Sequence, residues 1–266
     1  TEEKLFFPFV PTATGKTTFL RAISAVMGDY AAVADFETFL KKDHRGPGND
    51  IAKLAGRRLV MSVEVDDGAK LAEGLLQQVS GGDRMTARHL YAEFFEFVPT
   101  FTLWLASNSR PRVRDDNGAI WRRIVQIPFV EQISESERDD GLKSALCDLD
   151  IAGPAVLAWM VKGCLDWQQM GLKIPQQVRD MTADYRLEMN PLAGFLEERC
   201  VLSPEAKVKN PDLREAYLQW AKENNVRRPL SAKAVAQRLK AKEGVSQVNL
   251  SGVRVWNGIG LSPEKC

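Results

Sequence analysis

The first residues of the chain most directly suggest a loop that binds phosphate. The stretch from Val10 to Thr17 reads Val-Pro-Thr-Ala-Thr-Gly-Lys-Thr, and it follows an apolar run and precedes a helical pattern. In such a context, backbone N–H groups at the helix N-terminus point at an anion. Lys16 would reach the β- and γ-phosphates of a nucleotide, and the Thr17 hydroxyl would bind Mg²⁺. The expected nucleotide-binding residues are Pro11, Thr12, Ala13, Thr14, Gly15, Lys16, Thr17 and Thr18.

The loop departs from the usual pattern at its start. Val10 stands where G-x-x-x-x-G-K-[ST] has its first glycine. Glycine permits a positive φ and a close approach to a ligand, whereas a β-branched residue resists both. The loop alone therefore leaves two interpretations open, a nucleotide site or a helix N-terminus that happens to read Gly-Lys-Thr.

Acidic residues follow a second apolar run, Arg58–Val63. An acid at the end of such a strand can hold Mg²⁺ through water and orient the attacking water. Glu64 is the first candidate for this role, and Asp66 and Asp67 are alternates, with Asp66 as a further metal ligand. The two aspartates would equally complement the dipole of a following helix, so that interpretation stays open for them.

Asn108 and two arginines complete the candidate site. Asn108 ends the apolar run Phe101–Ser107 and could sense the γ-phosphate or position the water, although asparagine is also an ordinary turn residue here. Arg122 and Arg123 precede another apolar run. Such a pair is usually solvated, but in a ring ATPase one arginine can reach the γ-phosphate held by a neighbouring subunit.

Alternating strands and helices must position these residues, which predicts an α/β fold. Short apolar runs typical of a buried, mainly parallel sheet lie at Lys4–Phe9, Arg58–Val63, Phe101–Ser107 and Ile124–Pro128. Helical patterns lie between and after them, at Lys16–Met27, Asp50–Leu54, Gly68–Val79 and Glu135–Cys147. Beyond about residue 150 the pattern is helical, at Ile151–Met170, Pro175–Leu187 and Pro191–Cys200.

The last part of the chain predicts a winged helix-turn-helix. An amphipathic helix at 211–224 and a second helix from Ser231 to about Lys242 precede two short strands, at 246–250 and 253–257. Basic residues gather on the second helix and the hairpin, where a winged helix contacts a duplex, although a solvated face is the alternative. The candidate duplex-binding residues are Lys233, Arg238, Lys240, Lys242 and Arg254.

Composition limits the remaining possibilities. The chain has 266 residues with 36 basic and 35 acidic side chains, so any basic surface must be local. Its four cysteines form no C-x-x-C pair and its two histidines are isolated, which argues against a zinc site and favours a reducing, cytoplasmic location. No apolar run reaches membrane-spanning length, so no membrane partner is expected. Because only nine residues precede the loop, we expect a fragment of a longer protein.

Taken in order, these segments resemble one family. Gly-Lys-Thr, Glu64, Ser-Gly-Gly-Asp-Arg-Met-Thr-Ala-Arg at 80–88, Leu-Trp-Leu-Ala-Ser-Asn-Ser-Arg-Pro at 103–111 and Trp-Arg-Arg-Ile at 121–124 follow one another. Together they look like the superfamily 3 helicase domain of phage and plasmid primase-helicases, a group that includes poxvirus primase-helicases. The resemblance covers roughly residues 5–165.

The resemblance implies an AAA+-type ATPase core that assembles as a hexameric ring and translocates on single-stranded DNA with ATP and Mg²⁺. By position, Lys16 and Thr17 would bind phosphate and Mg²⁺, Glu64 would be the acidic residue, Asn108 the sensor, and Arg122 or Arg123 the finger acting on the neighbour. The 83–88 segment resembles a hairpin that lines the ring channel. Arg84 and Arg88 would there contact DNA phosphates.

The resemblance also implies a division of the chain. Residues 1–165 would be the ATPase core, 166–204 a helical connector and 205–266 a winged-helix DNA-binding domain. The leading interpretation is thus an ATP-dependent DNA helicase module of a phage or plasmid replication protein. Val10 favours a rival, a non-hydrolysing DNA-binding or initiator protein on a degenerate AAA+ scaffold, and Gln77 replaces a lysine found in many relatives. A ring ATPase acting on another polymer is a third possibility.

Overall fold

The computed structural model describes residues 2–9, 14–41, 48–63, 69–113, 118–224, 226, 229–250 and 252–262. The chain divides into two compact units, Thr1–Ala183 and Asp184–Cys266, and their boundary falls within helix α6 (Gln176–Met189). The boundaries expected from the sequence, after residues 165 and 204, fall inside α5 (Gly153–Met170) and strand β8 (Cys200–Lys209). In the described ranges, no helix combines the length and apolar character needed to span a membrane.

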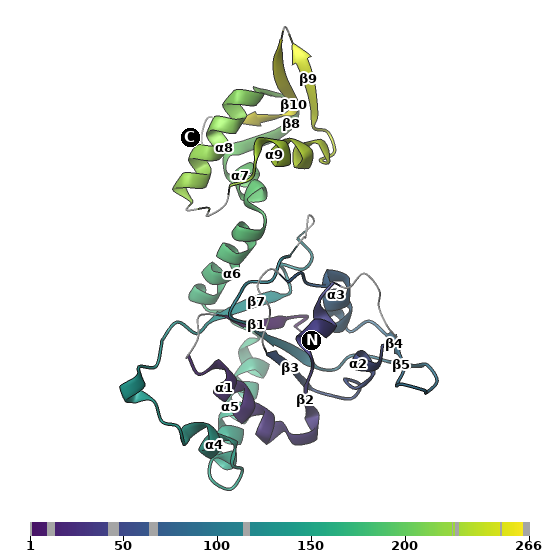
Figure 1. Ribbon diagram of the computed structural model, residues 1–266, viewed down its shortest axis with the longest axis vertical. Coiled ribbons are helices and arrows are strands. Elements are labelled where there is room, and N and C mark those ends of the chain that lie inside the picture. Colours follow the sequence, from purple (N-terminus) through teal and green to yellow (C-terminus); the bar gives the residue numbers. More distant parts are fainter. Residues whose placement is uncertain are drawn as a thin grey trace. The chain divides into compact units, whose positions relative to one another are not determined.

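A five-stranded parallel sheet forms the centre of the first unit (Figure 1). Its strands pair in the order β2-β3-β6-β1-β7. Four of them match the apolar runs of the sequence, and β2 was not predicted because it is a three-residue strand without a strong pattern. The bounds are β1 (Leu5–Phe9), β2 (Ala31–Val33), β3 (Leu59–Val63), β6 (Thr102–Ala106) and β7 (Ile124–Pro128).

The order of the strands creates a candidate site at the edge of the sheet that is formed by the carboxyl ends of its strands. From β1 the chain runs out to β2, returns through β3 to β6 beside β1, and then continues in β7 on the other side of β1. In open α/β sheets, ligands bind beyond the carboxyl ends of the strands where such connections diverge. The residues that follow β1 and β6 meet at this edge, because Phe9 pairs with Ser107 and the Ser107 N–H donates to the Pro8 carbonyl at 3.3 Å.

Helix α1 (Lys16–Met27) packs on this sheet through its apolar face. Leu20 is buried in a cluster with Leu59, Met61 and Ala106 from β3 and β6. Figure 1 shows α1, α4 (Leu142–Cys147) and α5 together on one side of the sheet, and the three helices contact one another. The same unit contains α2 (Asn49–Ala52), α3 (Glu73–Gly81) and the short helices η1 (Gly28–Tyr30) and η2 (Phe36–Phe39).

Two predicted helices are shorter than expected. The helix predicted from Gly68 begins at Glu73, because Lys70 and Leu71 form bridges with Arg112 and Leu40 instead. The helix predicted over 135–147 is interrupted. A short helix η3 (Glu135–Glu137) begins with a capping box at Ser134, and α4 starts only at Leu142. The capping pattern therefore marks a separate turn rather than the start of one long helix.

A separate hairpin extends away from the central sheet in Figure 1. Its strands are β4 (Met85–Ala87) and β5 (Phe95–Phe97), which pair antiparallel. The 83–88 segment, expected to be a hairpin from the family resemblance, contains only the first of these strands, and the second strand lies beyond the expected bounds.

The second unit packs helices against a three-stranded antiparallel sheet with the order β8-β10-β9. Aromatic side chains form its core, with Phe195 against both Tyr217 and Trp220 at ring distances of 5.4 and 5.9 Å. Ser231, the predicted start of the second C-terminal helix, caps α9, since its hydroxyl accepts from the Ala234 N–H at 3.2 Å. The further elements are α7 (Pro191–Arg199), α8 (Asn210–Glu223), α9 (Ala232–Lys240), β9 (Ser246–Leu250) and β10 (Val253–Leu261).

Strand β10 continues past the predicted end at Asn257 because Gly258 carries a bulge. Gly258 has φ +84, and a Cβ there would lie 1.9 Å from the Gly244 carbonyl oxygen. The register with β8 shifts between Asn257 and Ile259 at the same point. A glycine that looks like a strand end in the sequence is thus an irregularity within the strand.

Candidate functional site

Lys16 is the first residue of α1, and the residue before it explains how the loop meets the helix. Gly15 has φ 80 and ψ 2, a left-handed conformation that glycine adopts without strain. The first turn of α1 has no acidic side chain and no side-chain cap. Its N-terminal N–H groups and the helix dipole are therefore available to an external anion.

The side chain of Lys16 reaches across to the end of β6. Its Nζ donates to Asn108 Oδ1 at 2.7 Å and to the Ser107 carbonyl at 3.4 Å. Only 8% of Lys16 is exposed, and this burial lowers the pKa of its amine from the ordinary value. Two residues singled out separately in the sequence thus contact each other directly at the carboxyl edge of the sheet.

A tight turn holds Asn108 in place. The buried Ser107 hydroxyl donates to the Ser109 carbonyl at 2.7 Å, and the Ser109 N–H donates back to that hydroxyl at 3.0 Å. Together with the backbone bond from Ser107 to Pro8, these contacts fix the turn beside the end of β1. The backbone at Asn108 is therefore fixed by the residues before and after it.

The described part of the loop fits a phosphate group. Thr14 Oγ1, two residues before α1, is buried and has no hydrogen-bond partner within the described ranges. Thr17 and Thr18 are half-buried in the first turn. A cation, an unsatisfied hydroxyl and a helix N-terminus are together complementary to an anion. The remaining loop residues, Val10, Pro11, Thr12 and Ala13, lie outside the described residues.

The metal side of the site is described only in part. Glu64 and Asp66, like Asp67, lie outside the described residues, so Thr17 is the only predicted Mg²⁺ ligand that the structure places. Among the described residues, no group of three histidine, cysteine or acidic side chains could hold a metal ion.

Arg122 and Arg123, which sequence reasoning could not separate, differ in the structure. The Arg123 guanidinium donates to Glu3 Oε2 at 2.9 Å and to Ser80 Oγ at 3.1 Å, and its side chain is 17% exposed. Arg122 is exposed, and its side chain makes no hydrogen bond or ion pair with any residue that the structure describes. Arg123 thus supports the fold within its own chain, whereas Arg122 is free to contact another molecule.

Arg110 is a polar residue near the site for which no role was predicted. Its guanidinium lies 4.8 Å from the centre of the Phe9 ring and donates to Gln126 Oε1 at 2.9 Å. Gln126 is fully buried on β7, and its backbone N–H donates to Thr182 Oγ1 at 3.0 Å. The contacts link the turn after Asn108 to β7. The glutamine within the apolar run Ile-Val-Gln-Ile-Pro was the sequence feature that could have indicated this buried polar contact.

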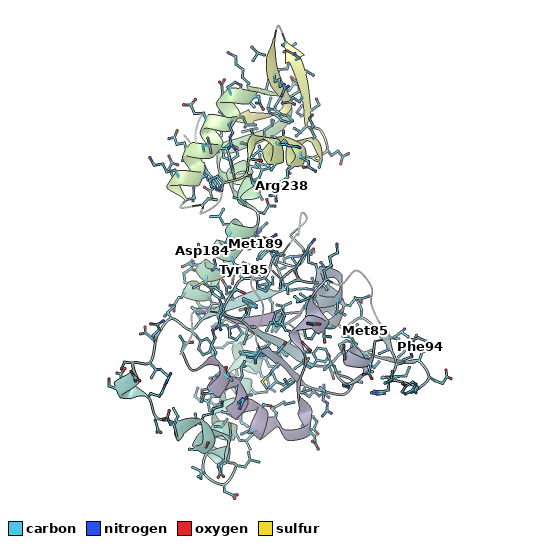
Figure 2. All side chains as sticks on the ribbon, viewed as in Figure 1. Met85, Phe94, Asp184, Tyr185, Met189 and Arg238 are labelled. Carbon is cyan, nitrogen blue, oxygen red and sulfur yellow. The ribbon has the colours of Figure 1, made fainter. Side chains whose placement is uncertain are left out.

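The two hairpin arginines predicted to bind DNA have partners inside the hairpin. Arg84 Nη1 forms an exposed ion pair with Glu96 Oε2 at 3.1 Å. The Arg88 guanidinium lies 4.8 Å from the centre of the Phe94 ring, and Figure 2 labels Phe94 near the tip of the hairpin. The ion pair is open to solvent and costs little to exchange for a DNA phosphate.

The tip of this hairpin exposes apolar and aromatic side chains that sequence reasoning missed. Tyr91 is 97% exposed and has φ 61, a conformation uncommon for any residue other than glycine. Leu90 and Phe94 are also exposed, and His89 stacks on Phe95 with ring centres 5.5 Å apart. An exposed aromatic face on a projecting hairpin can stack on an unpaired base.

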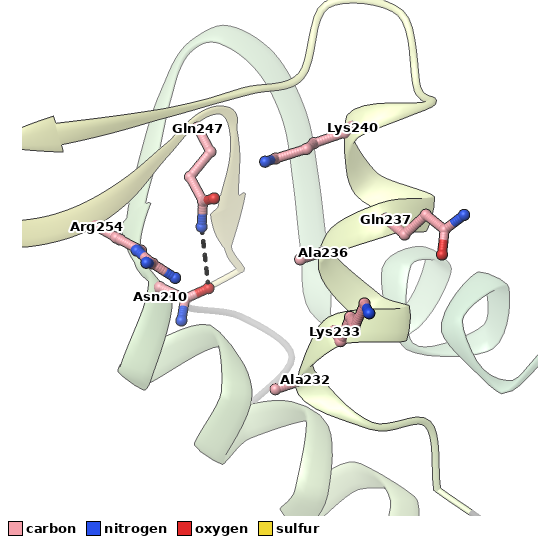
Figure 3. A pocket seen from close by; sticks show the side chains of 8 residues that line it. All are labelled: Asn210, Ala232, Lys233, Ala236, Gln237, Lys240, Gln247 and Arg254. Atoms are coloured by element: carbon pink, nitrogen blue, oxygen red, sulfur yellow. Dashed lines mark hydrogen bonds between the residues drawn. The ribbon is translucent and has the colours of Figure 1, made fainter.

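Three of the five predicted duplex-binding residues line one groove of the second unit. Lys233 and Lys240 come from α9 and Arg254 comes from β10 (Figure 3). Arg238 instead donates to Oδ1 of Asn190, the N-cap residue of α7, at 3.1 Å. Lys242 follows α9, is exposed, and does not line the groove.

Comparison with known proteins finds relatives among large DNA viruses. No protein-family model matches the chain. Three curated proteins named "Putative helicase" match most of it, at 24% identity in Acanthamoeba polyphaga mimivirus, 26% in Frog virus 3 and 24% in Invertebrate iridescent virus 3. The matches cover 84%, 81% and 77% of this chain but only 25%, 24% and 25% of those proteins. The chain is thus similar to helicase-like proteins and spans about a quarter of their length.

Two solved structures of the NrS-1 C-terminal region, both without ligand, resemble the chain more distantly. One has a TM-score of 0.49 at 11% identity and covers 98% of this chain and 67% of that one. The other has a TM-score of 0.48 at 9% identity, with 97% and 67% covered. At these values the similarity gives no information on function.

Proposed function

We propose that this chain is the ATP-dependent DNA helicase module of a replication protein, with an AAA+ core of the superfamily 3 type. The observation that carries the proposal is the contact between Lys16 and Asn108, which joins the start of α1 to the turn after β6. Relatives named as helicases support it independently. The parallel strand order, with β1 between β6 and β7, agrees with such a core.

Bound ATP with Mg²⁺ would supply the phosphoanhydride bond whose hydrolysis drives movement. In that site, the Lys16 ammonium attracts phosphate oxygens, and its burial strengthens the attraction because little solvent screens it. Asn108, released from Lys16, orients the attacking water through its amide. Thr17 would hold Mg²⁺ by its hydroxyl, with Glu64 and Asp66 as the proposed acidic partners.

The active form is proposed to be a homo-oligomer, a hexameric ring, in which a second copy completes each site. Arg122 is the better candidate for the finger that reaches the neighbour's γ-phosphate, because its side chain makes no hydrogen bond or ion pair within the described part of its own chain. Arg123 is held by Glu3 and Ser80 and positions the segment before β7.

DNA is the polymer that this chain is proposed to bind, and two surfaces would contact it. The β4–β5 hairpin would meet single-stranded DNA through phosphate contacts of Arg84 and Arg88 and through the exposed Tyr91 at its tip. The second unit has the element order of a winged helix, with α8 and α9 followed by the β9–β10 wing. Lys233, Lys240, Lys242 and Arg254 would hold duplex phosphates there, and Arg238 would mainly stabilise the unit.

ATP hydrolysis with and without single-stranded DNA tests this function. We expect Mg²⁺-dependent turnover that DNA stimulates and that Lys16→Ala abolishes. Lys173→Ala, which changes an exposed lysine elsewhere in the first unit, is the matched control and should leave turnover unchanged. If wild-type turnover is absent, Val10→Gly should restore it by supplying the missing loop glycine. Folded wild type and Val10→Gly that both fail to hydrolyse ATP contradict the proposal.

A second candidate is a non-hydrolysing DNA-binding or initiator protein on the same scaffold. Val10 in the loop favours it. DNA binding that is unaffected by nucleotide in both wild type and Val10→Gly would favour this candidate over the enzyme.

A further inference from the structure

The groove between α9 and the wing has a volume of about 750 Å³ and a mixed chemical character. Its α9 side carries Ala232 and Ala236, four residues apart, whose short side chains leave the helix surface accessible (Figure 3). Lys240 extends from α9 toward the wing, and Arg254 lies on the opposite side of the groove. A long polymer can therefore approach the helix closely while cations flank it on both sides.

The cations of the groove lack internal counter-ions. Lys233, Lys240 and Arg254 form no ion pair or hydrogen bond with any residue in the described ranges. Arg238, on the same helix, is by contrast tied to Asn190. Unpaired cations attract phosphates of any sequence, so they account for affinity but not for selection among sequences.

Fixed amides distinguish this groove from a surface that only holds phosphates. Asn210 Oδ1 accepts from the Trp256 indole at 2.9 Å and from Gln247 Nε2 at 3.4 Å (Figure 3). An indole N–H can only donate, so it sets the orientation of the Asn210 amide and, through it, that of Gln247. Gln247 Oε1 is left as an acceptor in the groove. A phosphate would be repelled by an acceptor, whereas a base edge presents donors as well as acceptors.

Gln237 adds a second amide on the exposed face of α9. It stands between Lys233 and Lys240 at steps of four and three residues, so the three backbone positions share one face of the helix. In Figure 3 the Lys240 side chain extends toward the wing and that of Gln237 points away from it. Its amide makes no hydrogen bond with any described residue. A glutamine in this setting matches the N6 and N7 atoms of adenine, and an alanine methyl group fits the thymine methyl group.

We propose that this groove reads base edges in the major groove of duplex DNA, with Gln237 and Gln247 as the reading residues and A·T pairs as the preferred target. The inference rests on the proposed DNA-binding role of the second unit and extends it from holding DNA to selecting a sequence. Lys233, Lys240 and Arg254 position the duplex, and the two glutamines discriminate between base pairs.

Selection from a random duplex library by the full chain, without nucleotide, tests the proposal. We expect enrichment of a short motif that contains A·T pairs. Gln237→Ala should lower affinity for this motif by about 5- to 150-fold and relax the preference at one position, while random duplex binds as before. Lys233→Ala should weaken binding to all duplexes alike. Gln219→Ala, which changes an exposed glutamine on α8 outside the groove, should change neither.

A library that shows no base preference would overturn the proposal, as would a motif that survives both Gln237→Ala and Gln247→Ala unchanged. Absence of duplex binding would overturn it together with the proposed role of the wing. Because the assay contains no nucleotide, its result does not depend on ATP hydrolysis. Failure of the ATPase proposal would be seen in the separate measurement of ATP turnover.

Discussion

The Lys16 ammonium is bound by groups that a phosphate must replace. Asn108 Oδ1 and the Ser107 carbonyl hold it at 2.7 and 3.4 Å in a largely buried position. Burial disfavours the charged form and lowers the pKa of the amine. The charge that is proposed to attract the nucleotide is therefore easier to lose with rising pH than that of an exposed lysine.

The lowered pKa of Lys16 predicts how nucleotide affinity changes with pH. The ammonium is present below its pKa and lost as the pH rises through it, so affinity should fall before the pH reaches the ordinary lysine value of 10.5. Lys16→Arg keeps its charge over this range and should remove the fall. Fluorescence anisotropy of a labelled ATP analogue, from neutral pH upward, measures this. An equal fall in both proteins would show that another group titrates.

The two adjacent arginines predict different losses. Arg122→Ala should reduce turnover by about 1,000-fold or more, as loss of an arginine finger does, and leave the free energy of unfolding unchanged. Arg123→Ala should lower the free energy of unfolding by about 1–3 kcal/mol, because Glu3 and Ser80 lose their partner. Denaturant unfolding and steady-state turnover measure the two effects. The reverse pattern would assign the finger to Arg123.

At the scale of elements, the hairpin tip predicts a contact that does not depend on charge. Tyr91→Ala should lower affinity for single-stranded DNA by about 5- to 150-fold, the usual range for one stacked base, and Tyr91→Phe should retain it. The dependence of binding on salt should stay the same, because no phosphate contact is lost.

Anisotropy across a salt series separates this contact from those of the arginines. Arg84→Ala combined with Arg88→Ala should reduce the salt slope by roughly one unit per phosphate contact. Tyr30→Ala, an exposed tyrosine outside the hairpin, is the control. A reduced salt slope in Tyr91→Ala would contradict stacking.

Much of the central sheet could be predicted from the sequence, because β1, β3, β6 and β7 are apolar runs of typical length. Strand β8 could not, since Cys-Val-Leu-Ser-Pro-Glu-Ala-Lys-Val-Lys contains proline and is mostly exposed. The length of β10 was hidden by Gly258, whose role depends on the distant Gly244.

Of the predicted members of the candidate site, the structure brings Lys16 and Asn108 together, but their contact could not be predicted from the sequence. Family resemblance placed Lys16 and Asn108 in one site, and the pairing of β1 with β6 brings them together. Which of Arg122 and Arg123 is exposed depends on Glu3 and Ser80, which no local pattern connects to them. Exposure of Tyr91 likewise depends on where the hairpin turns.

At the scale of the whole molecule, assembly predicts that two inactive variants restore each other. Lys16→Ala lacks a working pocket and Arg122→Ala lacks a finger, so each alone should be inactive. In a mixed ring, about one quarter of the interfaces would join an intact pocket to an intact finger. ATP turnover of variants mixed before assembly measures the recovery.

The control for this experiment pairs Lys16→Ala with the double variant Lys16→Ala, Arg122→Ala, which provides no intact pocket. Light scattering should confirm that the variants assemble together. Co-assembled mixtures that regain no activity would place the complete site within one chain.

The bond between Lys16 and Asn108 also has a thermodynamic consequence that runs in both directions. Phosphate and Asn108 compete for the same ammonium, so a ligand that draws the turn after β6 away from Lys16 tightens nucleotide binding. By linkage, nucleotide then favours that ligand by the same factor. If DNA displaces this turn, the ATP affinity measured with DNA and the DNA affinity measured with ATP must change equally, and one titration fixes the outcome of the other.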